Sequence, residues 1–378
     1  MKIIKKAVLP KGFQANGVSC GLKHSGGLDL SLMVSSVPAK TACMFTVNTI
    51  PAAPVILDKQ YYAGRKLFRA IIANSGNANC FTGTKGLRDA QVMSESAAAG
   101  LGIKKEEVLV ASTGIIGKPL DIEKITRAVP GLVKSLSARG IDSAKRAIMT
   151  TDTFAKEITA RFKIGGETVT VSGIAKGAGM IAPDMATMFV FLFTDALISQ
   201  PALEKALRES VERSFNCVTV DGCMSTNDTV IIMANGLSGN TSITGGRYLR
   251  IFTDALNFIC LELAKMLVLD GEGASKFIEI KVTNARSVVE AKKVALQIAN
   301  SNLFKCAMYG ENPNFGRIVA SVGACGIDIR EQDLKIRLGS LKKKKIDVEV
   351  RLSRGKAECV VYTSDLTPRY IKINAEYS

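Results

Sequence analysis

Hydrophobic and polar residues follow one another along this chain in short periodic runs that predict both strands and helices. Apolar and β-branched runs bounded by Gly, Pro or Asn predict strands, at residues 31–37, 42–48, 68–75, 108–120 (running into a glycine-rich turn), 147–162, 167–177, 188–193 and either side of a polar loop within 218–236. A period near 3.6 predicts helices, at residues 88–103, 122–136 (broken at Pro130), 200–216 and 247–269. Strands and helices grouped without a regular βαβ spacing favour a layered α+β fold.

One junction in this pattern raises a chemical question. The stretch KGAGMIAPDMATM leads into the apolar run Met188–Phe193, which predicts a strand buried on both faces. Thr187 stands at the junction, where one interpretation is simply the first residue of a strand, a position that Thr favours. In the other, the Thr187 hydroxyl attacks the Ala186 carbonyl, and water cleaves the resulting ester. The freed α-amine, with an ordinary pKa of about 7.7–8.0, is then the base of an N-terminal nucleophile.

The histidine count narrows the possible chemistry. The chain of 378 residues contains one histidine, His24, in a turn-like segment. A Ser-His-Asp triad or a Cys-His pair would have to use it, and zinc sites with several histidine ligands are excluded. A nucleophile here therefore needs a base other than imidazole.

Composition favours a protein of the cytoplasm. The nine cysteines form no CxxC pair, no apolar run reaches the length of a membrane span, and the N-terminus lacks a signal-peptide pattern. We therefore expect reduced thiols and no membrane partner.

The formal net charge of +16 is spread along the chain, and only Lys342–Lys345 form a dense run. We interpret that run as a solvated turn, with a nucleic-acid patch as the alternative. Aromatic residues make up 6% of the chain, Trp is absent and no nucleic-acid signature appears, so no nucleic-acid partner is expected. A basic protein also suits an anionic small substrate.

Two glycine motifs imitate nucleotide sites. GAGMIA, from Gly177 to Ala182, fits a dinucleotide fingerprint, but Pro183 and a strand pattern follow where a helix is required. TGIIGK resembles part of a P-loop, but Ser112 stands in place of the first glycine. We therefore expect no dinucleotide or nucleotide site at either motif.

Many further motifs together resemble one family. They are GVSCGLKHSGGLDLSLMVS, MFTVNTIPAAPV, NSGNAN, STGIIG, AIMTTDTFAK, KGAGMIAPDMATM, TVDGCMSTNDT, DGEGASKF, NPNFGRIVASVG and DLTPRYIKINAEYS. In this order, over essentially the whole chain, they are similar to the ornithine acetyltransferase (glutamate N-acetyltransferase) family of arginine biosynthesis. Each motif alone is weak evidence, whereas the ordered series is highly specific.

The resemblance implies a fold and a maturation step. The fold would be a layered α/β architecture with an α-β-β-α core, similar in chemistry to N-terminal-nucleophile hydrolases but with its own connectivity. Self-cleavage between Ala186 and Thr187 would give an α chain (1–186) and a β chain (187–378). The β chain would comprise a core part (187–280) and a smaller α+β part (281–378), and the assembly would be α2β2.

The resemblance also assigns roles to residues. Thr187 matches the nucleophile, and Thr113 with Gly114 matches the oxyanion hole. Substrate-contacting positions, again by resemblance, are Thr151, Lys176, Thr187, Glu272, Asn374 and Ser378. Lys176 would hold a substrate carboxylate, and Glu272 would hold the amine of ornithine or tune proton transfers.

The implied reaction is ping-pong. An acetyl-Thr187 intermediate would carry acetyl from N2-acetyl-L-ornithine to L-glutamate without any metal or organic cofactor. Some family members also use acetyl-CoA, and the sequence leaves that second activity open.

Several positions depart from the family pattern, and two other functions stay open. Ala155 replaces the usual Pro, Cys223 and Met224 replace an acidic residue followed by Thr or Ser, and Asn312 and Phe315 replace Asp and Trp. These departures put the exact substrate in doubt. One alternative is an N-terminal-nucleophile aminopeptidase or amidase. The other is an uncleaved basic paralogue that binds RNA or protein and has no catalytic activity.

Overall fold

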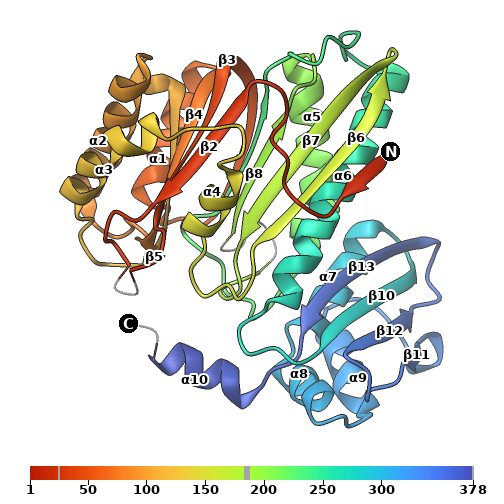
Figure 1. The fold of residues 1–378 in the computed structure, drawn as a ribbon. Helices are drawn as coiled ribbons and strands as arrows, with labels where there is room; N and C mark the ends of the chain where they lie inside the picture. Colours follow the sequence, from red (N-terminus) through yellow and green to blue (C-terminus); the bar gives the residue numbers. More distant parts are fainter. Residues whose placement is uncertain (24–25, 183–187, 377–378) are drawn as a thin grey trace. The chain divides into compact units, whose positions relative to one another are not determined.

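Two units make up the part of the chain that the computed structural model describes, residues 1–23, 26–182 and 188–376 (Figure 1). The first unit contains the described residues up to 177, 188–213 and 225–263. The second contains 178–182, 214–224 and 264–376. Two short segments from the middle of the chain therefore belong to the same unit as the last third of the chain.

The first unit is built on a nine-stranded sheet. Its strands are β1 (Lys2–Ile4), β2 (Phe13–Val18), β3 (Leu30–Phe45), β4 (Leu67–Asn77), β5 (Val108–Ile115), β6 (Lys156–Ile164), β7 (Glu167–Lys176), β8 (Phe189–Thr194) and β9 (Thr229–Ala234). They lie in the order β1-β6-β7-β8-β9-β3-β4-β5, with β2 pairing with β3. All six residues of β8 are buried, as its continuous apolar run predicts.

Strand β3 is shared by the two halves of this sheet. Its first part, Leu30–Val34, pairs with β4, and its last part, Lys40–Phe45, pairs with β9. The register shifts between Val34 and Ala39, where Pro38 has no N–H to donate to a ladder. The sequence predicted two separate strands here; the structure has one 16-residue strand with an irregularity in its middle.

Side-chain alternation along the strands separates an inner from an outer apolar layer. Ile71 and Leu109 lie in an inner cluster with Phe191 of β8, so the two halves of the sheet share this cluster. Their sequence neighbours Ile72 and Val110 lie in an outer cluster with helices α2 (Gly83–Leu101) and α3 (Ile122–Lys134). Alternate residues of one strand thus face opposite layers.

Helices cover both outer faces of this double layer (Figure 1). Helices α1 (Ala53–Gly64), α2 and α3 lie over one half, and α5 (Gln200–Glu212) and α6 (Gly246–Leu269) over the other. Gly173 of β7 leaves room for α6, because a Cβ there would crowd Ile259 and Leu263. The expected α-β-β-α layering is confirmed. Helix α6 is the helix that the sequence predicts over residues 247–269.

Two local predictions are wrong. Helix α3 runs through Pro130 without ending there, since losing one backbone donor does not outweigh the burial of Val129 and Leu132. The strand expected from residue 147 begins only at Lys156. Before it, α4 (Ile141–Ala147) packs into the inner cluster through side chains at helical spacing, Ile141, Ala144 and Ile148.

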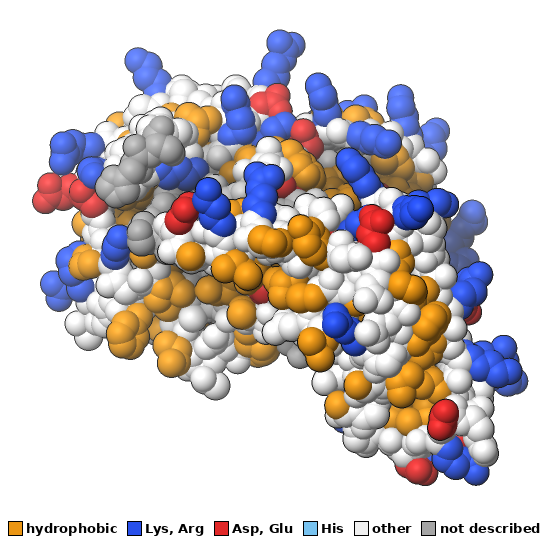
Figure 2. All heavy atoms as spheres, turned by 90° about the horizontal axis from the view of Figure 1, so that it is seen from below, with side chains coloured by type: hydrophobic (Ala, Val, Ile, Leu, Met, Phe, Trp, Pro, Cys, Tyr) orange, Lys and Arg blue, Asp and Glu red, His pale blue; other side chains and the backbone are white. Residues whose placement is uncertain are grey.

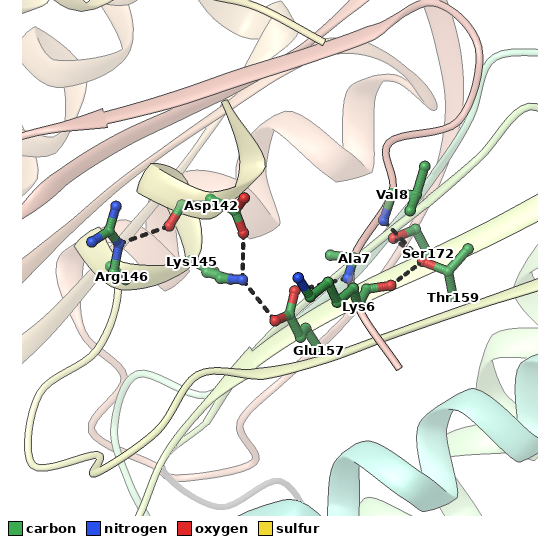
Figure 3. Close-up of polar contacts among 9 residues, drawn as sticks. All are labelled: Lys6, Ala7, Val8, Asp142, Lys145, Arg146, Glu157, Thr159 and Ser172. Carbon is green, nitrogen blue, oxygen red and sulfur yellow. Dashed lines mark hydrogen bonds and ion pairs between the residues drawn. The ribbon is translucent and has the colours of Figure 1, made fainter. Parts of the chain in front are cut away.

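Polar contacts fix the N-terminal segment to β6 (Figure 3). Glu157 Oε2 accepts from the Ala7 N–H at 2.8 Å, and Thr159 Oγ1 accepts from the Val8 N–H at 2.9 Å. Lys145 of α4 donates to Glu157 Oε1 at 2.7 Å and also pairs with Asp142. This network joins three chain segments on one edge of the unit.

The second unit has a four-stranded sheet in the order β11-β12-β10-β13. The strands are β10 (Phe277–Ala285), β11 (Lys335–Leu338), β12 (Lys345–Arg351) and β13 (Ala357–Ser364), and the helices are α7 (Val288–Ala299), α8 (Asn302–Tyr309), α9 (Phe315–Gly323) and α10 (Pro368–Glu376). Three-residue 3₁₀ helices lie at Phe215–Cys217 and Glu331–Asp333 in this unit, and at Lys105–Glu107 in the first unit. The core packs α7, α8 and α9 against the strands, whereas α10 buries no residue.

The lysine run is the exposed turn that the sequence suggested, and its last member, Lys345, begins β12 and pairs with Glu279 and Asp347. Within the described ranges, every helix is too short or too polar to cross a membrane.

A buried acid links α1 to the edge strand β5 and makes stability depend on pH. Asp58 Oδ1 accepts from the Val110 N–H at 2.9 Å, while Oδ2 has no partner in the described part of the chain. Burial raises the pKa of Asp58 well above its usual value, and the Val110 N–H offsets only part of this. The folded state therefore binds the proton more tightly than the unfolded state, and stability falls as pH rises above the unfolded pKa.

We predict that Asp58→Asn removes this pH dependence while keeping an acceptor for Val110. The melting temperature of the variant relative to the wild type should rise between about pH 5 and pH 8, by roughly 2–4 °C per kcal/mol recovered. Thermal unfolding at several pH values measures this. The control is Asp254→Asn on the exposed face of α6. A difference for Asp58→Asn that stays constant with pH would contradict the prediction.

Candidate active site

The end of strand β5 carries the two residues expected to form an oxyanion hole. Thr113 and Gly114 lie opposite Ser75 and Gly76 of β4 in the parallel ladder, and Thr113 is almost fully buried. Gly114 has φ of +137°, and a Cβ there would overlap backbone atoms of Gly76 and Asn77. Only glycine allows this approach of the two strands.

Lys176, the last residue of β7, reaches this strand end from the other half of the sheet. Its side chain is buried, and its Nζ donates to Thr113 Oγ1 at 2.8 Å and to Thr150 Oγ1 at 3.3 Å. The structure thus brings together Lys176 and Thr113, which the sequence proposed separately. Thr151, the predicted contact, is half-buried, and its neighbour Thr150 makes the bond to Lys176.

Asp152 is a site residue that the sequence analysis missed. Its side chain has no exposed surface; Oδ1 accepts from Lys156 Nζ at 2.6 Å and the Gly177 N–H at 2.7 Å, and Oδ2 accepts from the Thr150 N–H at 2.9 Å. Burial pushes the pKa of Asp152 up, but the ammonium groups of Lys156 and Lys176 and the Gly177 N–H outweigh it, so the pKa lies below its usual value. The signal available in the sequence was an Asp four residues before a Lys.

Asp228, the residue before β9, was missed as well. It is fully buried; Oδ1 accepts from the Met188 N–H at 2.9 Å, and Oδ2 has no partner in the described part of the chain. Burial raises the pKa of Asp228 well above its usual value, against smaller opposing effects of the Met188 N–H and Lys176. Beside it, the Asn227 amide donates to the carbonyls of Ala78 and Ser112, which fixes the end of β5.

Two of the other predicted site residues meet in the second unit. The Asn374 amide donates to Glu272 Oε2 at 2.8 Å, and the Glu272 N–H donates to the Ala178 carbonyl at 2.9 Å. A Cβ on Gly179 would overlap the Glu272 carboxylate, so a larger residue at this position would displace that carboxylate. Glu272 and Asn374 thus form one polar pair beside Ala178 and Gly179 of the same unit.

Asp221 gathers further contacts in the same unit. Its carboxylate accepts from the N–H groups of Met180 and Ile181 at 2.6 and 2.9 Å, and from the Tyr370 hydroxyl at 3.2 Å. Close by in sequence, the Val220 carbonyl accepts from the buried ammonium of Lys305 at 2.6 Å, and burial lowers the pKa of Lys305 to about 8. The strand and helix pattern contains no signal for these contacts.

Several predicted residues lie outside the described residues: Ala186, Thr187, Ser378 and His24. Among the positions that depart from the family pattern, Cys223 is exposed and its N–H donates to Asp221 at 3.1 Å. Phe315 begins α9 and is half-exposed. In residues 1–23, 26–182 and 188–376, no three His, Cys, Asp or Glu side chains gather closely enough to hold a metal ion.

Surface charge forms no single stripe on the face drawn in Figure 2. Lys and Arg side chains stand apart there, with acidic and apolar side chains between them. This distribution differs from the continuous basic surface typical of nucleic-acid binding.

Comparisons with known proteins agree with one another. The ArgJ family model matches residues 14–378. The arginine biosynthesis bifunctional protein ArgJ of Geobacter sulfurreducens is 43% identical over 389 residues, covering 97% of this chain and 99% of that protein. The glutamate N-acetyltransferase of Methanocaldococcus jannaschii is 42% identical, with 100% of both covered. A solved ornithine acetyltransferase from Mycobacterium tuberculosis, in complex with ornithine, is 37% identical over 48% of this chain and 97% of that chain, with a TM-score of 0.44.

These matches place the chain in a class of enzymes, the acyltransferases of arginine biosynthesis. Within that class, the chain belongs to the ArgJ family. The predicted membership of the ornithine acetyltransferase (glutamate N-acetyltransferase) family and the predicted enzyme class are both confirmed.

We predict that Gly114→Ala destabilises the fold at the site. The variant would place a Cβ against the backbone of β4 and strain a positive φ, so the free energy of unfolding should fall by about 3 kcal/mol or more. Urea-induced unfolding measures this.

The matched control is Gly117→Ala, in the loop that directly follows β5. Gly117 also has positive φ, at +83°, but a Cβ there would meet no atom within 4 Å. Its substitution should cost only the backbone strain, about 1–2 kcal/mol. Equal losses in the two variants would mean that the close approach to β4 does not determine the residue at position 114.

Proposed function

We propose that this protein is an ornithine acetyltransferase that moves acetyl from N2-acetyl-L-ornithine to L-glutamate. Thr187 is the nucleophile, and the reaction is ping-pong through an acetyl-Thr187 ester. The observation that carries the proposal is the buried hydrogen bond between Lys176 and Thr113. It places a cation and a hydroxyl in one water-poor site, where charge that develops during acyl transfer is strongly stabilised.

The base in this proposal is the α-amine of Thr187, freed by cleavage of the Ala186–Thr187 peptide bond. The amine takes the hydroxyl proton as oxygen attacks the acetyl carbonyl, and it returns the proton to the leaving amine of ornithine. Thr113 and Gly114 donate hydrogen bonds to the tetrahedral oxyanion. Glutamate then attacks the ester by the reverse sequence of proton transfers.

Substrate recognition uses opposite charges. Lys176 holds a substrate carboxylate, and Glu272 with Asn374 binds the second amine of ornithine. Thr151 and Ser378 complete the proposed contacts. The M. tuberculosis relative is described in complex with ornithine, which supports a zwitterionic amino-acid substrate.

Further features of the proposal follow the family. The mature protein would consist of chains 1–186 and 187–378 in an α2β2 assembly, in the cytoplasm, with 187–280 as the core part of the β chain. No cofactor takes part. The G. sulfurreducens relative is named bifunctional, and acetyl-CoA is accordingly the second acetyl donor to test.

The proposed transfer has a direct test. Protein mixed with N2-acetyl-L-ornithine alone should release about one ornithine per site and gain the mass of one acetyl group on the fragment that begins at Thr187. Glutamate should then remove that mass and yield N-acetylglutamate. Steady turnover by hydrolysis, or cleavage of amino-acid amides in place of transfer, would favour an amidase.

We predict that Thr187→Ala gives one intact chain and abolishes acetyl transfer, because it removes both the hydroxyl that cleaves the chain and the nucleophile. Denaturing intact-mass spectrometry should show two fragments that meet at Ala186 and Thr187 in the wild type, and one chain in the variant. The control is Thr168→Ala at an exposed position of β7, which should be cleaved normally. Cleavage between the same two residues in Thr187→Ala would overturn the mechanism.

A further inference from the structure

Among the buried charged side chains of the first unit, Lys156, Lys176 and Asp152 lie close together, and only Lys176 has a role in the proposed reaction. Lys176 and Lys156 are fully buried, and the carboxylate of Asp152 has no exposed surface. Burying an ammonium group costs several kcal/mol unless a counter-charge or hydrogen bonds compensate. The proposed reaction uses Lys176, whereas nothing in it yet requires Asp152.

Asp152 is bound on all sides by groups that fix its position. The Thr150 N–H, the Gly177 N–H and Lys156 Nζ all donate to its two oxygens, at 2.6–2.9 Å. Two of these donors lie next to the Lys176 interaction: Gly177 follows Lys176 in the chain, and the Thr150 hydroxyl accepts from Lys176. The Asp152 carboxylate thus binds the backbone of two residues next to Lys176: Gly177, its neighbour in the chain, and Thr150, its hydrogen-bond acceptor.

The bond from Lys176 to Thr113 has a fixed direction. An ammonium group only donates, so Thr113 Oγ1 accepts from Lys176 at 2.8 Å and its own hydroxyl hydrogen points elsewhere. A hydroxyl that accepts from a cation is polarised and becomes a stronger donor. At the predicted oxyanion hole, that hydrogen is the group that stabilises the oxyanion.

We propose that Asp152 is a positioning residue that keeps Lys176 charged and directed at Thr113, so that the Thr113 hydroxyl donates its own hydrogen to the oxyanion. This role rests on the proposed function for Thr113 and Thr187. The low pKa of Asp152 is consistent with it, since the carboxylate stays ionised in spite of its burial.

Other charged groups also face Asp152 or Lys176 and affect how their charges change with pH. Lys156 comes from β6, Asp228 is the residue before β9, and Lys23 comes from the loop before β3. Asp228 has a raised pKa and Lys23 a lowered one, in both cases mainly through burial. Of the two acids Asp152 and Asp228, Asp152 therefore stays ionised over the wider range of pH.

The test begins with Asp152→Asn, measured as the pH profile of acetyl transfer by the full protein. Without the carboxylate, Lys176 should lose its proton at lower pH, and the alkaline limb of kcat should move down by about one pH unit or more. At the alkaline end kcat should fall about tenfold, with a smaller change in KM. A uniform loss at every pH, without movement of the limb, would mean a merely structural role.

The control is Asp142→Asn, which removes a similar partner from Lys145 in the network of Figure 3. Asp142 is mostly exposed and contacts none of the site residues, so its profile should match the wild type.

Two further variants make the test independent of how well Asp152→Asn folds. Lys156→Met removes the competing cation and leaves Asp152 to Lys176, so the alkaline limb should stay in place or move up; a downward shift would overturn the proposal. In Lys176→Met, adding Asp152→Asn should lower kcat no further, because Asp152 acts through Lys176. If the double variant instead had a kcat reduced by the product of the two single losses, the proposal would also be overturned.

A spectroscopic measurement separates this proposal from the proposed function. The side-chain ¹³Cε signal of Lys176, assigned with Lys176→Arg, should titrate at lower pH in Asp152→Asn than in the wild type. An unchanged titration refutes the link between Asp152 and Lys176 even in an active enzyme. Absence of acetyl transfer in the wild type refutes the proposed function and leaves this titration a valid test of the link.

Discussion

The hydrogen bond between Lys176 and Thr113 joins the two halves of the first unit at the candidate active site. Thr113 lies near the end of β5 in one half, and Lys176 ends β7 in the other, with the inner apolar cluster between the layers. That cluster excludes water, so a polar contact at its edge is stronger than the same contact on the surface. Strand order, the shared strand β3 and the glycine at 114 all serve to bring these two strand ends together.

The sequence predicted much of this arrangement, because its strongest signals are local. The apolar run of β8 and the long period of α6 specify buried elements whatever lies around them. The ordered motifs supplied Thr113, Lys176, Glu272 and Asn374, and the structure joins them in pairs within each unit. The helix that continues through Pro130 was not predictable, since tertiary burial there overrides a local preference.

The contacts that were missed share a physical reason. Asp152 and Asp228 are short acidic residues in polar loops, and the same composition describes ordinary solvated turns. What distinguishes them is burial next to backbone N–H groups from distant strands, which only the folded chain reveals. Lys305 is similar, because nothing in a helical period indicates that its ammonium will bind carbonyls far along the chain.

Asp152 and Asp228 show how one site can hold two buried acids in different states. The ammonium groups of Lys156 and Lys176, together with the Gly177 N–H, hold the pKa of Asp152 low, whereas burial raises the pKa of Asp228 and its one N–H bond offsets only part of this. Two ammonium groups, Lys156 and Lys176, then face one firmly ionised carboxylate. The Lys176 ammonium donates to Thr113 Oγ1 in this buried environment of low dielectric constant. In the proposed function, the positive charge of Lys176 attracts a substrate carboxylate or a developing oxyanion at this position, and the net charge of +16 spread along the chain is not needed for that attraction.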